Sequence, residues 1–177
     1  MCISAGVDYL EIVGEKGMRI LFDCANPDDY LRAKSLVMLK TKEEIERAKK
    51  KPFIVTHEFC ALITFQDEEY FLRIPKGYEW NGANVPPFAW LLIGEKTDPR
   101  FMLASCLHDF LCEHHNVIKN NRYASTLVFI TCCNHFGKFN AIKRWAMKHS
   151  VDNFQKICGK DLKGQKWKNL SRKKISS

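Results

Sequence analysis

The hydrophobic pattern of this chain changes its period at Pro86-Pro87, and the change divides the sequence into two kinds of structure. Before the prolines, short segments rich in β-branched and aromatic residues alternate with turn-forming residues, which is typical of antiparallel strands. After them, apolar residues recur every three or four positions, which is typical of amphipathic helices. The sequence therefore predicts an α+β fold, with an antiparallel sheet from the N-terminal half packed against about three helices from the C-terminal half.

The expected strands form two hairpins. In the first, Gly-Glu-Lys-Gly joins residues 9–13 to residues 18–22. In the second, Gln66-Asp67-Glu68 joins residues 53–65 to residues 70–74. Loops of this length and composition favour pairing between the strands that they connect.

A charged helix is expected between the hairpins, over about residues 41–51. Thr41 and Glu44 match a capping box, in which Thr41 is the N-cap and Glu44 is the third helical residue. Because the segment is charged along its length, we expect it to be an insertion on the surface.

The second half contains four helix signals. Pro86-Pro87 begins a short segment that ends at Gly94, and Asp98-Pro99 begins a helix that continues to about His115. Asn121 can cap the next helix, whose Leu-Val-Phe-Ile-Thr-Cys-Cys run predicts a central position. A last helix follows Gly137, and its expected apolar stripe is Phe139, Ile142, Ala146, Val151, Phe154 and Ile157.

The length of 177 residues and the position of the charge predict one α+β domain over residues 1–159, followed by a basic tail. The tail, residues 160–177, has seven Lys or Arg residues and one Asp, so it supplies +6 of the formal charge of +8. Nucleic acid or an acidic protein surface can bind such a tail, and a solubilising role is the alternative. The residues expected to contact a polyanion are Lys166, Trp167, Lys168, Arg172, Lys173 and Lys174.

The N-terminus lacks the basic start and apolar segment of a signal peptide, and the longest uncharged run, residues 123–137, is too short to span a membrane. We therefore expect no membrane association and a place in the cytoplasm. The eight cysteines include no Cys-x-x-Cys pair and lie mostly in apolar segments, which favours buried thiols over a disulfide framework.

The candidate site combines a turn with a polar pair on a helix. His108 and Asp109 are adjacent in an otherwise apolar segment, and such a pair can act as an oriented general base, as two metal ligands or as a structural anchor for a loop. Trp80, Asn81, Gly82 and Asn84 precede the helix and form the expected ligand-binding loop. The Asn-Gly turn is also explained by backbone geometry alone.

The motifs Ile-Pro-Lys-Gly-Tyr-Glu-Trp-Asn-Gly-Ala-Asn-Val-Pro-Pro and Leu-His-Asp-Phe-Leu resemble an uncharacterised domain family common in bacteriophages and prophages. Its members have roughly G-F-x-T-D-G-A-S-I-P and then H-D-x-L-Y, and the resemblance covers about residues 70–155. It implies that a His and three acidic groups converge as in a metal-dependent hydrolase.

Two of the acidic positions are neutral in this chain, where Asn81 stands at the turn and Ser125 at the later helix. Divalent cations need anionic oxygen, so we expect no cofactor. If a divalent metal were bound, His108 and Asp109 would be its ligands.

Three other kinds of site are weaker alternatives. The HD phosphohydrolases need a further upstream His and downstream Asp on helices, where this chain offers His57 on an expected strand and Asp152. A Cys nucleophile paired with a His is a second alternative. The third is a zinc site, for which the candidate ligands are Cys112, His114, His115, Cys132, Cys133 and His135.

Together these features predict a phage-type accessory protein with a hydrolase-like scaffold and a weakened His-Asp site, acting in the host cell. The alternative is a non-enzymatic virion or assembly component that binds virion proteins or nucleic acid through its surface and tail.

Overall fold

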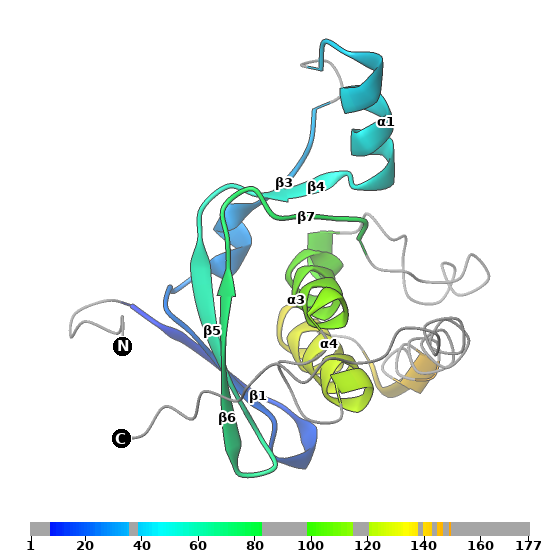
Figure 1. Cartoon of the computed structure of the whole chain (residues 1–177). Coiled ribbons are helices and arrows are strands. Elements are labelled where there is room, and N and C mark those ends of the chain that lie inside the picture. The colour runs from blue at the N-terminus through cyan, green and yellow to red at the C-terminus, as the bar shows by residue number, and fades with distance from the viewer. Residues whose placement is uncertain are drawn as a thin grey trace, which may run out of the picture.

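The computed structural model describes residues 8–35, 39–82, 99–114, 121–137, 140–142, 145–146 and 149. Antiparallel sheets occupy its N-terminal half and helices its C-terminal half (Figure 1), so the α+β prediction is confirmed. The strands form two sheets, whereas one was expected. No helix in the described part of the chain has the length and apolar character needed to cross a membrane.

The larger sheet has four antiparallel strands in the order β1-β2-β5-β6. The strands are β1 (Leu10–Val13), β2 (Arg19–Phe22), β5 (Phe59–Phe65) and β6 (Glu68–Ile74). Both predicted hairpins are present, and every second residue of β5 is buried. Gln66 and Asp67 have φ values of 54° and 59°, the left-handed geometry of a tight two-residue hairpin turn.

The smaller sheet has three antiparallel strands in the order β3-β4-β7, and it corrects one expectation. The strands are β3 (Leu31–Ala33), β4 (Phe53–Val55) and β7 (Glu79–Trp80). The segment 53–65, expected as one strand, is thus divided between the two sheets at residues 56–58. Its odd-numbered residues are buried on both sides of the break, so the alternation stays in phase and the sequence does not reveal the switch.

The helix α1 (Lys42–Lys50) has the predicted capping box. The Glu44 amide donates to Thr41 Oγ1 at 3.1 Å, and the Thr41 amide donates to Glu44 Oε2 at 3.0 Å. The helix lies beside the smaller sheet and away from the other helices (Figure 1). Its Arg47 Nε donates to Glu79 Oε2 of β7 at 2.7 Å, and Lys34 Nζ contacts the other Glu79 oxygen at the same distance.

The helices α3 (Met102–Glu113) and α4 (Asn121–Gly137) pack against each other beside the larger sheet (Figure 1). Leu103, Cys106, Leu107, Phe110 and Leu111 of α3 are buried, and Met102 is partly exposed. Residues 124–133 of α4 are all buried, which confirms its central position. Gly14 in the first hairpin lies against Thr131 so closely that a Cβ atom there would clash.

Several helix predictions have other outcomes. Asn121 is the first residue of α4 instead of its cap. In the last segment, residues 141–142, 145–146 and 149 are helical and Ala146 is buried, but the Ile142 side chain is 72% exposed, so its place in the apolar stripe was wrong. The short segment 86–94 and Asp98 lie outside the described residues, as does the tail.

Candidate functional site

The polar pair lies in the second half of α3. His108 Nδ1 is 3.3 Å from Asp109 Oδ1, and each side chain is 13% exposed. Their positions one residue apart place them on neighbouring sides of the helix, where the imidazole bends back toward the carboxylate. The pair is therefore shielded from most solvent and can reach a ligand through its small exposed area.

The carboxylate of Asp109 holds the Asn-Gly loop on the helix. It accepts a hydrogen bond from the Asn81 backbone amide. Gly82, the next residue, is buried with a φ of 84°, a left-handed conformation that glycine adopts without strain. This bond corresponds to the loop-anchor role, one of the three roles considered for the pair.

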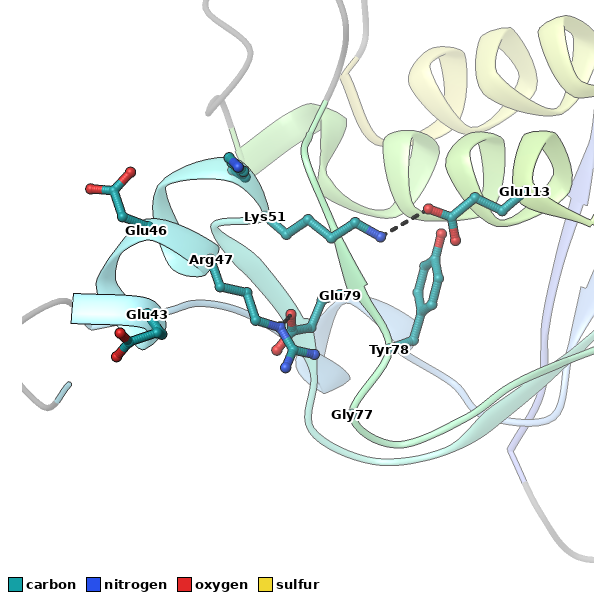
Figure 2. Close-up of a pocket in the computed structure, with 9 residues that line it drawn as sticks. Glu43, Glu46, Arg47, Lys51, Gly77, Tyr78, Glu79 and Glu113 are labelled. Carbon is teal, nitrogen blue, oxygen red and sulfur yellow. Dashed lines mark hydrogen bonds and ion pairs between the residues drawn. The ribbon is translucent and has the colours of Figure 1, made fainter. Parts of the chain in front are cut away.

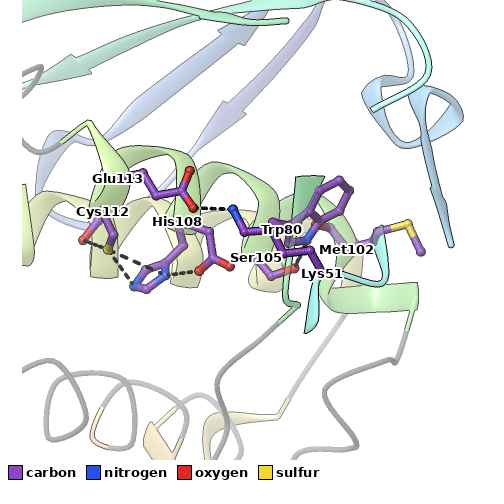
Figure 3. A network of polar contacts seen from close by, with 9 residues as sticks. Lys51, Trp80, Met102, Ser105, His108, Cys112 and Glu113 are labelled. Atoms are coloured by element: carbon purple, nitrogen blue, oxygen red, sulfur yellow. Dashed lines mark hydrogen bonds and ion pairs between the residues drawn. The ribbon is translucent and has the colours of Figure 1, made fainter. Parts of the chain in front are cut away.

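A thiol and a hydroxyl complete the surroundings of His108. Cys112 Sγ lies 3.8 Å from His108 Nε2 and 4.0 Å from Nδ1 (Figure 3), and it also lies 3.9 Å from Ser125 Oγ. The edge of the His108 ring faces Phe129 of α4, with a centroid distance of 5.7 Å. Cys112 thus lies between the His-Asp pair, whose Asp109 binds the Asn81 amide, and Ser125.

Cys112 was considered in the sequence as a zinc ligand with residues of α4, and its contact with His108 was missed. The two residues are four positions apart on one helix, a spacing that places side chains next to each other. This four-residue spacing was the sequence signal that could have predicted the contact.

Burial and hydrogen bonding act against each other at the pair. Burial of the imidazole disfavours its charged form, but hydrogen bonds with Asp109 and Cys112 outweigh burial and raise the pKa of His108 to about 9. Burial also raises the pKa of Asp109, although its bonds with His108 and the Asn81 amide oppose the shift. At neutral pH the imidazole is thus protonated, and the pair is an ion pair with limited access to water.

Trp80, expected in the ligand-binding loop, lies in the core. Its side chain has no exposed area, and its ring stacks on Phe53 at 5.3 Å. Its Nε1 donates to Ser105 Oγ at 3.0 Å, and Ser105 donates in turn to the Met102 carbonyl oxygen at 3.0 Å (Figure 3). The ring therefore connects β7 to the first half of α3. Asn84 lies outside the described residues.

Two buried oxygen atoms lie in the loop residues near Asp109, Tyr78 Oη and Asn81 Oδ1. Burial, followed by the charge of Glu113, raises the pKa of Tyr78 well above its ordinary value, and a hydrogen bond with Glu113, toward which the hydroxyl points (Figure 2), adds to the shift. Asn81 Oδ1 has no hydrogen-bond partner among the described residues, so this oxygen can accept a hydrogen bond from a polar ligand. Tyr78 was missed in the sequence because its neighbour Glu113 is 35 positions away.

A shallow cavity of about 640 Å³ lies between α1 and the end of α3 (Figure 2). Its charged groups are largely paired: Lys51 Nζ binds Glu113 Oε1 at 2.9 Å, and Arg47 binds Glu79. Tyr78 lines it and points toward Glu113 (Figure 2). Because these charges neutralise each other, the cavity offers no concentrated charge to a ligand.

The candidate zinc ligands do not converge. Within the described residues, no three His, Cys, Asp or Glu side chains are grouped to hold a metal ion. Cys132 and Cys133 are buried in α4 and His135 is exposed, whereas His114 Nδ1 donates to the Phe110 carbonyl oxygen at 2.9 Å. A donor at Nδ1 is the arrangement that this carbonyl requires, so His114 is engaged by its own helix.

Comparison with known families gives one result. A family model described as "Protein of unknown function (DUF1353)" matches residues 56–151, which is more than half of the chain. The match begins after α1 and contains β5, β6, β7, α3 and α4. It also contains the polar cluster, by which we mean Tyr78, Asn81, His108, Asp109, Cys112 and Ser125. No curated protein and no solved structure matches the chain significantly.

Proposed function

The chain belongs to the DUF1353 family of proteins of unknown function, and we propose that it is a phage-type accessory protein, active in the host cell, with a hydrolase-like scaffold and a weakened His-Asp site. The observation that supports the proposal is the bonding of Asp109. Its carboxylate bonds to the Asn81 amide and contacts His108, so it serves to hold the loop on the helix. With neutral side chains at positions 81 and 125, the site offers a divalent cation too little anionic oxygen.

Binding without hydrolysis is the activity that this site supports. Asn81 Oδ1 is a buried acceptor in the loop bound by Asp109, and it has no partner within the described part of the chain. A small polar molecule that donates a hydrogen bond to it would satisfy this atom. The loop held by Asp109 would then position the Asn81 side chain against that ligand.

Metal content tests the weakened site directly. The purified protein is expected to carry less than one equivalent of divalent metal. Asn81→Asp combined with Ser125→Asp restores the acidic groups of the family pattern, so the double variant should bind Mn²⁺ in calorimetry more tightly than either single variant. The single variants are the matched controls because each adds one carboxylate. A full equivalent of metal in the wild-type protein, lost in His108→Ala, would contradict the proposal.

The charge of the tail supports a second candidate, a virion or assembly component that binds a polyanion. Residues 160–177 carry a net charge of +6, and Trp167 stands between Lys166 and Lys168. Binding through such a segment releases counterions, so the association constant should fall steeply with salt.

Removal of residues 160–177 tests this candidate. Binding to single-stranded DNA, measured by fluorescence anisotropy at low salt, should disappear, while the circular dichroism spectrum of the remaining chain stays unchanged. If the truncated chain binds as tightly as the full chain, the tail is not the determinant. If the full chain does not bind at low salt, an acidic protein partner replaces nucleic acid in this candidate.

A further inference from the structure

The polar cluster contains a nucleophile that neither the family match nor the proposed function uses. Cys112 is partly exposed, and its sulfur lies within 4.0 Å of both nitrogens of the His108 ring (Figure 3). We propose that Cys112 is a reactive thiol, activated by His108, and that it is a site of modification by low-molecular-weight disulfides.

Contact with the His108 ring is the basis of the proposed reactivity of Cys112. A thiolate is the nucleophilic form of cysteine, and an adjacent imidazolium stabilises it. Asp109 contacts the same imidazole at Nδ1 and favours the protonated ring. The helix dipole has opposite effects on the two residues at the end of α3. It stabilises the His108 imidazolium and destabilises a thiolate at Cys112. Direct contact with the imidazolium is therefore the interaction that must supply the activation.

Among the described residues, two acidic groups of α3 lie near the pair. They are Asp109 and Glu113, and Glu113 is bound to Lys51. On α4 the facing groups are the Ser125 hydroxyl and the Phe129 ring, neither of which changes charge near neutral pH. The His108 ring is in direct contact with the Cys112 sulfur, so the test substitutes this residue.

The buried cysteines provide the contrast that makes this modification selective. Burial raises the pKa of Cys106 and of Cys132 well above the ordinary value for a thiol, and it raises the pKa of Cys24 to about 11. Cys106 and Cys132 have no exposed area. These three thiols are neutral and inaccessible in the folded chain, so they should not compete with Cys112.

The reaction is a thiol–disulfide exchange. The Cys112 thiol releases its proton to water, and the thiolate beside the His108 imidazolium attacks one sulfur of a disulfide such as glutathione disulfide. The sulfur–sulfur bond of the reagent breaks as the bond to Cys112 forms. The leaving thiolate takes up a proton from water, so one thiol is released, the Cys112 sulfur is oxidised and the reagent is reduced.

The test follows the adduct at each cysteine of the full-length protein. The native chain is treated with glutathione disulfide at pH 7, digested at intervals, and analysed by mass spectrometry. Cys112 should react about tenfold faster in the wild type than in His108→Gln, which removes the imidazolium but keeps a polar side chain of similar length. His114→Gln is the matched control, because this histidine stacks on Phe110 at 4.2 Å and should leave the rate unchanged.

Two further measurements separate activation from a structural effect. The ratio of the Cys112 rates at pH 8 and pH 6 should be smaller in the wild type than in His108→Gln, because the imidazolium preserves the thiolate at the lower pH. Native Cys112 should also react faster than the same residue in the urea-unfolded wild-type chain, a comparison that requires no variant. A native rate equal to or below the unfolded rate would overturn the proposal, as would equal rates in the wild type and a folded His108→Gln.

Discussion

The two ends of α3 hold carboxylates in different ways. Near the first turn, Asp28 accepts a hydrogen bond from the Leu103 amide, one of the free amides at the start of a helix. In the second half, Asp109 is bound by His108 and by the Asn81 amide. A helix start provides donors and a positive dipole end, whereas its C-terminal end presents carbonyls, so an anion near that end needs partners from elsewhere. This difference explains why the polar cluster is assembled from several parts of the chain.

The largest expected effect comes from removing the ring that connects β7 to the first half of α3. Trp80→Ala removes a fully buried ring and its bond to Ser105, so it should lower the free energy of unfolding by about 3–5 kcal/mol. Urea unfolding followed by circular dichroism measures the change. Trp80→Phe keeps an aromatic ring and is the control, with a smaller loss. A loss below about 1 kcal/mol for Trp80→Ala would show that this end of α3 does not depend on Trp80.

Two serines allow the ends of α3 to be compared by the same substitution. Ser105→Ala leaves the buried Trp80 Nε1 without its acceptor and should cost about 1–3 kcal/mol. Ser125→Ala removes a long contact with the Cys112 thiol, at 3.9 Å, and should cost less than about 1 kcal/mol. Both residues are buried, so solvent exposure does not confound the comparison in urea unfolding. Equal losses in the free energy of unfolding would mean that the two ends of α3 depend equally on these serine hydroxyl groups.

Local signals in the sequence were sufficient for much of the fold. The Thr41-Glu44 capping box and the Gln66-Asp67 turn are each formed by residues within a few positions, and both were predicted. The division of residues 53–65 between two sheets was not predicted, because the alternation of buried residues has the same phase on both sides of the break. That switch depends on which strands are available as partners, which is a tertiary property.

The candidate site shows the same contrast between local signals, which the sequence contains, and contacts between distant residues, which it does not reveal. His108 and Asp109 stood out as polar residues in an apolar helix, and the contact of Asp109 with the loop was expected because buried polar groups need partners. The contact of Asp28 with Leu103 spans 75 positions, and neither residue has a motif that indicates it. The burial of the Tyr78 hydroxyl could not be predicted either, because its surroundings are formed by the end of α3, which is distant in the sequence.

The change in the free energy of unfolding between neutral and alkaline pH should report on His108, in the second half of α3. The pKa of His108 is about 9 in the folded chain and about 6.5 when unfolded, so between these values the folded state keeps a proton that the unfolded state has released. The stabilisation is complete below pH 6.5 and is lost as pH rises through 9. His108→Gln should therefore be less stable than the wild type by roughly 1–2 kcal/mol at pH 6, with a difference that shrinks toward pH 9. Urea unfolding across this range measures it, and a constant difference would show that His108 acts through packing alone.

The smaller of the two pH-dependent effects belongs to Asp28 and lies in a more acidic window. Burial, and then the charge of Asp29, raises the pKa of Asp28 from 3.8 to about 6, although the Leu103 amide opposes the shift. Between these values the folded state binds the proton more tightly, so stability is highest at low pH and falls as pH rises from about 4 to 6.

Asp28→Asn keeps an oxygen for the Leu103 amide and removes the buried charge, so it should be more stable than the wild type by about 1 kcal/mol at pH 7 and nearly equal to it at pH 4. Asp29→Asn is the control, because this neighbouring side chain is exposed and should produce a smaller change. A destabilised Asp28→Asn at pH 7 would mean that the charge of Asp28 stabilises the start of α3 by more than its burial costs, and both ends of the helix would then depend on a charged carboxylate.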